Sequence, residues 1–194
     1  RRALRVAFGV QVLHVFQIRT VTADAHVQAV ADVDGVDGAR VDLAELALPV
    51  MDEQNHPRLQ RYTHAHTRRF SEIIARGDAY VFVTTEYNYA IPGALKNALD
   101  YLGPEWAGKP ICEVAYGGVS GAARAVEDLR RIAVALRMIP LVQGVVCPLY
   151  AQQRDDEGRF HGNPTQIEAA AETLQILADL GAVLKARRLT ADSQ

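Results

Sequence analysis

The stretch AYVFVTTEYNYAIPGALKNALDYL, residues 79–102, contains one complete strand, loop and helix. Its first part, Ala79–Thr85, is a short apolar run, and such runs are typical of strands that are buried on both faces. Its last part, Pro92–Leu102, has proline in the first helical turn and apolar residues every three or four positions. A strand that is followed at once by a helix indicates an α/β fold.

The same alternation continues on both sides of this unit. We expect further strands at Leu4–Val10, Ala39–Leu46, Ile111–Tyr116 and Leu141–Cys147, and helices at Pro57–Arg76, Ala122–Met138 and Pro164–Ala186. Because parallel neighbours need crossover connections, five strands separated by helices predict a five-stranded parallel sheet. No repeat or linker divides the chain. We therefore expect one domain over residues 1–188 and a frayed tail over residues 189–194.

The composition excludes several classes of protein. The chain has 194 residues and a net charge of −2, which argues against a basic nucleic-acid-binding protein. No apolar run approaches the length of a membrane span, and the N-terminal segment is too mixed for a signal peptide. Cys112 and Cys147 both lie in apolar runs and are expected to be buried, reduced thiols. Such thiols favour a cytoplasmic location.

The chemistry of an open α/β sheet lies beyond the carboxyl ends of its strands. Two loops come there, at residues 84–93 and 116–121. A flat heterocycle such as a flavin needs an aromatic wall, which Tyr87 and Tyr89 can supply, and close backbone approach, which Gly117 and Gly118 allow. The N-termini of the helices after both loops would add positive potential. Each loop alone is also compatible with ordinary turn chemistry, but their position on adjacent strands favours a site.

Residues 85–102 resemble the signature of the NADPH-dependent FMN reductases. These are flavodoxin-like enzymes that include quinone, chromate and azo-dye reductases. Three further segments, residues 41–49, 108–110 and 115–121, are also similar to that family, and the resemblance extends over residues 39–186. The family usually has proline where Thr85 stands and serine where Ala90 stands.

The resemblance implies a three-layer, flavodoxin-like sandwich with the strand order 2-1-3-4-5. It also implies bound FMN, with NADPH or NADH as cosubstrate, and a small electron acceptor such as a quinone, a free flavin, an azo compound or a metal oxyanion. A homodimer or homotetramer would place the flavin near a subunit interface. The flavin itself would carry the chemistry, with no side chain firmly assigned as acid or base. The residues expected around its ring are Glu86, Tyr87, Asn88, Tyr89, Gly117, Gly118 and Ser120.

The phosphate-binding loop departs from the family pattern. A Gly-Ser-x-Arg loop is expected after the first strand, where backbone amides and hydroxyls hold the FMN phosphate. Between Gly9 and Thr20 there is no further glycine and no hydroxyl side chain, so Arg19, Thr20 and Thr22 are the candidate phosphate ligands. Either residues 11–38 have diverged, with FMN lost or weakened, or a compensated frameshift has altered them. The alternatives to an enzyme are therefore a flavodoxin-like electron carrier and a flavin-free binding domain.

Three other features of the sequence bear on possible sites. His64 and His66 stand two positions apart, and on a helix such residues point in different directions, so we expect a solvated face rather than a metal site. The acidic run at residues 155–157 lacks the spaced ligands of a calcium loop and is expected to be plain surface. Trp106 could belong to the core or to a subunit interface.

Overall fold

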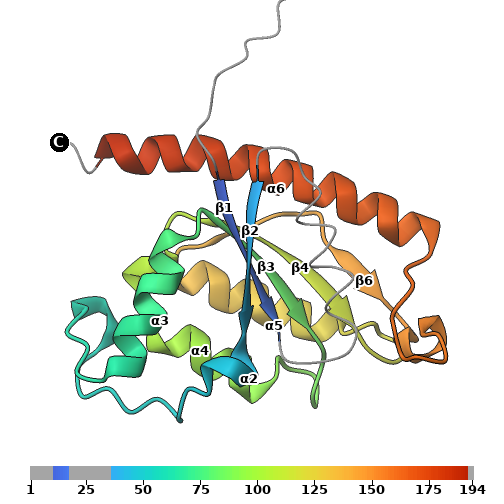
Figure 1. Cartoon of the computed structure of the whole chain (residues 1–194), viewed down its shortest axis with the longest axis horizontal. Helices are drawn as coiled ribbons and strands as arrows, with labels where there is room; N and C mark the ends of the chain where they lie inside the picture. The colour runs from blue at the N-terminus through green and yellow to red at the C-terminus, as the bar shows by residue number, and fades with distance from the viewer. Residues whose placement is uncertain (1–10, 18–35, 192–194) are drawn as a thin grey trace, which may run out of the picture.

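The computed structural model describes residues 11–17 and 36–191, which form one twisted parallel sheet covered by helices (Figure 1). The order along the sheet is β2-β1-β3-β4-β5, and β6 also pairs with β4. The strands are β1 (Gln11–Gln17), β2 (Val36–Asp42), β3 (Ala79–Thr84), β4 (Pro110–Tyr116), β5 (Ile139–Pro140) and β6 (Val145–Cys147). The arrangement β2-β1-β3-β4 is that of flavodoxin-like sheets, so the expected α/β class is confirmed.

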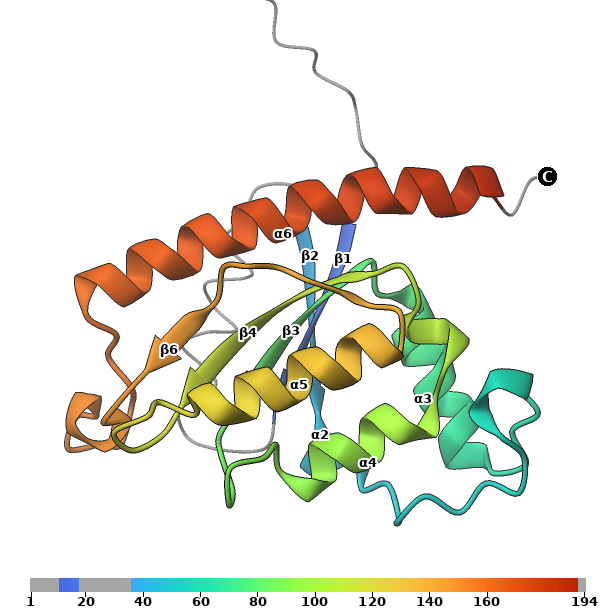
Figure 2. The same cartoon turned by 180° about the vertical axis from the view of Figure 1, so that it is seen from behind.

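The helices lie in two layers. They are α2 (Leu43–Leu46), α3 (Ala65–Arg76), α4 (Gly93–Tyr101), α5 (Ala123–Ala135) and α6 (Pro164–Ala191), with short 3₁₀ turns η1 (Pro57–Leu59), η2 (Pro104–Trp106) and η3 (Tyr150–Gln153). Figures 1 and 2 show α6 along one face of the sheet and α3, α4 and α5 on the other. None of the helices in the described ranges is long and apolar enough to cross a membrane.

The central strand β3 serves both layers, because successive side chains of a strand point to opposite faces. Tyr80 and Phe82 belong to the core under α3, α4 and α5, whereas Val81 and Val83 pack on the side of α6. Trp106 is completely buried in the first of these cores, where its ring meets the ring of Tyr80 at 5.2 Å between centroids. Trp106 is therefore a core residue.

The first two strands differ from the expectation. The predicted strand Leu4–Val10 lies outside the described residues, and Gln11–Gln17, expected as loop, forms β1. Polar Gln11, His14 and Gln17 interrupt its apolar pattern, which is why the sequence favoured the cleaner run before it. The predicted strand Ala39–Leu46 was wrong at its end. Asp42 ends β2 and its Oδ1 accepts a hydrogen bond from the N–H of Ala44 at 2.8 Å, which starts α2.

The end of the sheet and the last helix also required correction. The single strand expected at Leu141–Cys147 is replaced by β5 and β6, which leave residues 141–144 outside the ladder. There Arg130 donates to the carbonyl of Val142 at 3.2 Å. The helix expected to end at Ala186 continues to Ala191, so the first part of the expected frayed tail is helical. Arg188 holds these turns, because it donates to the carbonyl of Gly108 at 2.8 Å.

Candidate functional site

The two loops singled out from the sequence come together at one edge of the sheet. The carboxyl ends of β1, β3, β4 and β6, the arrowheads in Figure 1, all point to this edge. Residues 85–92 leave β3 there and lead into α4, and residues 117–122 leave β4 and lead into α5. Because β3 and β4 are neighbours, the two loops lie side by side.

The first loop contains a tight hairpin. Tyr87 and Ala90 exchange two backbone hydrogen bonds, at 3.0 and 3.1 Å, and the two residues between them, Asn88 and Tyr89, have φ of 51° and 70°. Positive φ at both central residues is the geometry of a type I′ turn, which asparagine tolerates and tyrosine does not favour. The turn leaves the side chains of Tyr87 and Tyr89 60% and 69% exposed.

Glu86 ties this loop to the start of α5. Its Oε2 accepts hydrogen bonds from the backbone N–H groups of Arg124 at 3.1 Å and Ala125 at 3.3 Å, while its Oε1 accepts from Nε of Arg124 at 2.8 Å and from the guanidinium Nη2. The hydrogen bonds from the Arg124 side chain are the main reason that the pKa of Glu86 lies below its usual value. The carboxylate thus caps α5, whose N-cap residue Ala122 offers no side-chain hydrogen bond.

This cap corrects one expectation. The N-terminus of α5 was expected to offer positive potential to a ligand, but the carboxylate of Glu86 already occupies it. Arg124 has a second contact, because its guanidinium carbon lies 4.0 Å from the centroid of the Tyr89 ring. Sequence reasoning missed Arg124, which lies in the first turn of α5 and donates to the Oγ of Ser120, in the loop before the helix, at 3.1 Å.

Of the three glycines in the second loop, Gly117 and Gly121 leave no room for a side chain, whereas Gly118 does. A Cβ at Gly117 would lie 3.1 Å from the backbone nitrogen of Ala122, so the close approach here is within the protein itself. A Cβ at Gly118 would meet no atom of residues 11–17 or 36–191 within 4 Å. The space beside Gly118 is therefore open to a ligand.

Backbone donors remain available around this space. Among the described residues, no hydrogen bond is donated by the backbone N–H groups of Glu86, Asn88, Tyr89 and Gly118. Together with the two exposed tyrosine rings, these donors fit a planar ligand that carries acceptor atoms along its edge, as the isoalloxazine of FMN does. Arg19 and Thr20, the expected phosphate ligands, lie outside the described residues; in the sequence they follow the end of β1 at Gln17.

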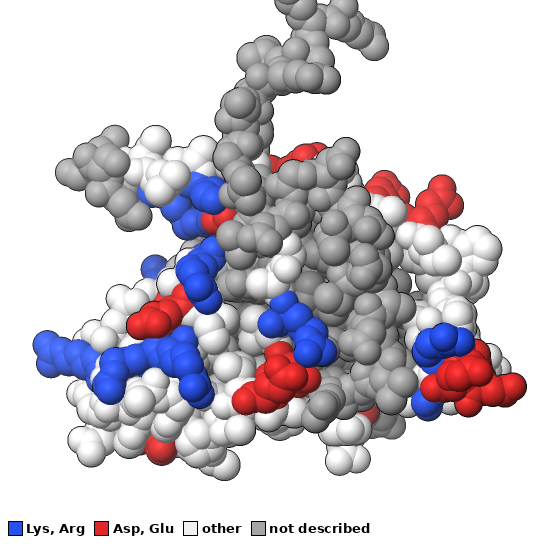
Figure 3. Space-filling model, in the orientation of Figure 1, with Lys and Arg blue, Asp and Glu red and all other residues white. Residues whose placement is uncertain are grey.

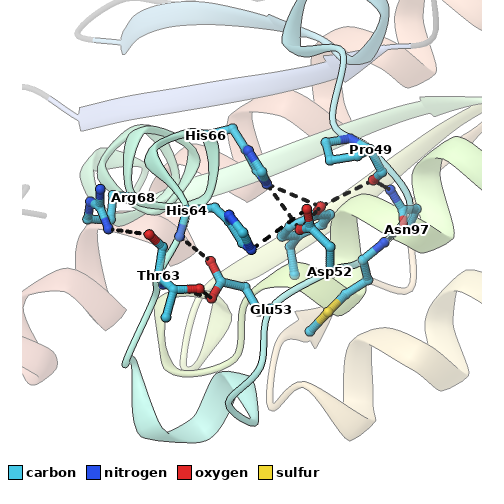
Figure 4. A network of polar contacts seen from close by, with 10 residues as sticks. Pro49, Asp52, Glu53, Thr63, His64, His66, Arg68 and Asn97 are labelled. Atoms are coloured by element: carbon cyan, nitrogen blue, oxygen red, sulfur yellow. Dashed lines mark hydrogen bonds and ion pairs between the residues drawn. The ribbon is translucent and has the colours of Figure 1, made fainter.

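The histidine pair is closer together than expected. His64 is extended and precedes α3, so the helical spacing argument does not apply to it. The two imidazoles stack with their centroids 5.1 Å apart, and their Nε2 atoms lie 3.8 Å (His64) and 3.2 Å (His66) from Asp52 (Figure 4). Tyr101 donates to the same carboxylate at 3.0 Å. Even so, no group of three or more His, Cys, Asp or Glu side chains within the described ranges is arranged to hold a metal.

The two cysteines are free and buried, on β4 and β6. Burial raises the pKa of the Cys147 thiol to about 11 and that of Cys112 well above its usual value. Both groups are therefore protonated and unreactive at neutral pH.

Comparisons with known proteins agree with this picture. The sequence model of a family described as NADPH-dependent FMN reductase matches residues 19–151. An NAD(P)H-dependent FMN reductase of Schizosaccharomyces pombe is 39% identical over 127 residues, which cover 58% of this chain and 63% of that protein. A quinone reductase of Escherichia coli K12 is 44% identical over 77 residues, which cover 37% of this chain and 41% of that protein. The chain spans less than two thirds of the length of the curated relatives it matches first.

One solved structure supports the fold over almost the whole chain. It is FerB from Paracoccus denitrificans, a flavoenzyme NAD(P)H:acceptor oxidoreductase. Its TM-score is 0.67 at 19% identity, and the match covers 89% of this chain and 97% of that one. At this level of identity the likeness concerns the arrangement of the elements.

Proposed function

Because the chain belongs to the NADPH-dependent FMN reductase family, we propose that it is an FMN-dependent NAD(P)H oxidoreductase. Bound FMN supplies a centre that takes two electrons from a nicotinamide and passes them to a second substrate. We propose NADPH or NADH as the donor and a small molecule as the acceptor. Quinones, free flavins, azo compounds and metal oxyanions are the candidate acceptors, and the similarity to a quinone reductase favours the first.

The observation that carries this proposal is the open space beside Gly118. It lies at the carboxyl edge of the sheet, where α/β folds bind their ligands, and it adjoins a loop with exposed aromatic rings and unpaired N–H groups. We assign the flavin ring to this space and the FMN phosphate to the segment after β1. The proposed cofactor-binding residues are Glu86, Tyr87, Asn88, Tyr89, Gly117, Gly118 and Ser120 for the ring, and Arg19 and Thr20 for the phosphate.

Three of these residues have distinct proposed tasks. The N–H groups of Glu86 and Asn88 would donate to the acceptor edge of the ring, and Tyr87 would cover one of its faces. The side chain of Glu86 acts through the loop rather than on the ligand, since its oxygens are bonded to Arg124 and to the start of α5.

We also propose a homodimer or homotetramer in the cytoplasm. Large apolar side chains are exposed next to the site, notably Tyr87 and Val119, of which Val119 is 86% exposed. A second subunit that covered them would bury this surface and would enclose the flavin. The free, buried thiols of Cys112 and Cys147 support a reducing compartment.

A substitution at Gly118 tests the proposed site. Gly118→Ala places a methyl group where the described part of the chain has no atom within 4 Å, so the fold should tolerate it. If the flavin ring occupies that space, we expect at least a tenfold loss of FMN affinity, measured by quenching of flavin fluorescence. Gly93→Ala is a matched control, because a Cβ at Gly93 also meets nothing within 4 Å but lies at the start of α4. Equal FMN affinity in both variants would contradict the assignment.

The same preparation separates the alternatives. Rapid bleaching of the bound flavin by NADPH or NADH is expected of the proposed enzyme. Bound flavin that neither nucleotide reduces would indicate an electron carrier, and protein that takes up no FMN would indicate a flavin-free binding domain.

A further inference from the structure

A second hollow lies at the same edge of the sheet, after β6. It has a volume of about 570 Å³ and lies between η3 and the loop that leads to α6. Its wall includes Pro148, Leu149, Gln152, Asp155, His161 and Asn163. Figure 3 shows the charged side chains of this loop gathered at the lower right, where Figure 1 places η3. The wall also has an apolar part, to which Leu149 contributes a side chain that is 43% exposed.

This hollow adjoins the loop to which we assign the flavin. The backbone N–H of Leu149 donates to the carbonyl of Gly118 at 2.8 Å, and that of Tyr150 donates to the carbonyl of Gly117 at 3.2 Å. Gly117 in turn donates to the carbonyl of Cys147 at 3.2 Å. The two loops thus form one hydrogen-bonded edge, and the hollow begins at the residues that flank the proposed flavin space.

One histidine in this wall is held in a fixed orientation. Nε2 of His161 lies 2.7 Å from Oδ2 of Asp155. The backbone N–H of His161 donates to the carbonyl of Gln153, also at 2.7 Å. Asp155 also accepts from Nε of Arg159 at 2.8 Å and from its backbone N–H at 2.8 Å. The hydrogen bonds from His161 and Arg159 hold the pKa of Asp155 well below its usual value. At neutral pH an ionised carboxylate therefore faces Nε2, which leaves Nδ1 of the exposed ring for a ligand.

The lining indicates what kind of molecule fits. Arg154 already donates to the carbonyl of Gly158 at 2.9 Å, and Arg159 is paired with Asp155 and Glu157. Cations that are engaged within the loop do not favour a phosphate-bearing nucleotide. The two charged residues of the wall, Arg154 and Asp155, each have a partner within the loop, and the rest of the lining is apolar or amide apart from one imidazole. Such a wall suits a small, flat, uncharged molecule with a carbonyl oxygen.

We propose that this hollow binds the electron acceptor as a quinone and that His161 is the catalytic residue that protonates it. The proposal rests on the function proposed above. A quinone becomes a hydroquinone by gaining two electrons and two protons. Bound, reduced FMN would supply both electrons and one proton as a hydride, and Nδ1 of the imidazolium of His161 would supply the second proton to the quinone oxygen. The neutral imidazole then regains a proton from water, and Asp155 is the positioning residue that orients the ring.

The test compares two oxidants of the NADPH-reduced, flavin-loaded protein in stopped flow. Duroquinone needs protons when it is reduced, whereas ferricyanide takes single electrons and needs none. For His161→Gln we expect reoxidation by duroquinone to slow by about tenfold to a hundredfold. This is at or below the low end of the range for general acid catalysis, which begins at about a hundredfold, because water also reaches the site. Reoxidation by ferricyanide and flavin reduction by NADPH should be unchanged. Asp155→Asn should show the same selective loss to a smaller extent, which a merely structural role would not produce.

Asp156→Asn is the matched control, since its carboxylate is in the same loop and has no hydrogen bond or ion pair with the described residues. A second measurement does not depend on turnover. Duroquinone added to the oxidised protein should shift the Cε1–H resonance of His161 in the NMR spectrum, and this can be seen even in protein that takes up no flavin.

Three results would overturn the proposal. One is equal slowing with both oxidants, which would indicate that His161 only stabilises the fold. Slowing of the NADPH step would likewise overturn it, because the hollow would then bind the nucleotide. The third is an unmoved His161 resonance at saturating duroquinone. Failure of the proposed function is distinct, because it appears before any quinone is added, as absent flavin or as flavin that NADPH does not reduce.

Discussion

Replacing Lys109 with methionine should remove a pH dependence of stability that this lysine imposes on the fold. Lys109 is buried just before β4, and its Nζ donates to the carbonyl of Ile74 and to the hydroxyl of Tyr80, both at 2.8 Å, and to the carbonyl of Ala75 at 3.3 Å. The two carbonyls belong to the last turn of α3. Burial, followed by the nearby charge of Arg188, lowers the pKa of Lys109 to about 7.

The magnitude follows from proton linkage. An unfolded lysine has a pKa of about 10.4. Because the folded pKa is lower, the unfolded chain binds more protons between the two values, so the free energy of unfolding rises with pH in that range. With about 1.36 kcal/mol for each pKa unit, the rise from pH 7 to pH 8.5 amounts to about 1.6 kcal/mol. The window ends there because the raised pKa values of Cys112 and Cys147 lower stability once unfolded thiols ionise.

Urea unfolding at several pH values between 7 and 8.5 measures this effect. Between pH 7 and pH 8.5, the free energy of unfolding of the wild type should rise by about 1.6 kcal/mol more than that of Lys109→Met. Lys96→Met is the control, because Lys96 is exposed on α4 and pairs only with Asp100. Its curve should run parallel to that of the wild type. Parallel curves for Lys109→Met and the wild type would refute the reasoning, since Lys109 would then bind its proton equally in both states.

Two further predictions concern the loop after β3. Glu86→Gln should lower the melting temperature, measured by calorimetry, by a few degrees at pH 7, because it weakens the cap of α5. The pKa of Glu86 is lowered in the folded state, so the carboxylate stabilises the fold only while it is ionised. The difference in melting temperature should therefore shrink as the pH falls below about 4. Tyr89→Gly should relieve backbone strain at φ 70° and raise the stability of the flavin-free protein by about 1 kcal/mol in urea, while FMN binding weakens. A Tyr89→Gly variant that is less stable than the wild type would contradict the inference that the backbone at Tyr89 is strained.

The sequence predicted best where local pattern and tertiary environment agree. Ala79–Thr85 is apolar at every position until its last residues, and β3 is buried on both faces, so pattern and burial coincide. The helix expected at Pro92–Leu102 was confirmed as α4, because Leu95, Ala98 and Leu99 face the core as its spacing indicates. The loop between these two elements, and the loop between β4 and α5, could be located for the same reason, since a loop is defined by the strand before it and the helix after it.

The sequence failed where a single polar side chain decides the local structure. The alternation through Leu43 and Leu46 also fits a helical repeat, and the hydrogen bond to Asp42 selects the helix. His64 could not be placed from its spacing to His66, because the backbone N–H of His64 donates to Glu53 at 3.0 Å and the residue stays extended. Contacts across the sequence of this kind, such as Glu86 with Arg124, are not visible in local patterns.

The hydrogen bonds of Glu86 help to hold Tyr89 in its strained backbone conformation. A tyrosine at positive φ costs about 1–2 kcal/mol relative to glycine, so the turn is held there by its surroundings. The surroundings are the hairpin bonds of Tyr87 with Ala90, the anchor of Glu86 on α5, and the guanidinium of Arg124 over the ring. Glycine would satisfy the backbone but would remove the ring. That the chain carries a strained tyrosine at an exposed position is therefore best explained if the ring has a task at this edge, and flavin contact is the task that we propose for it.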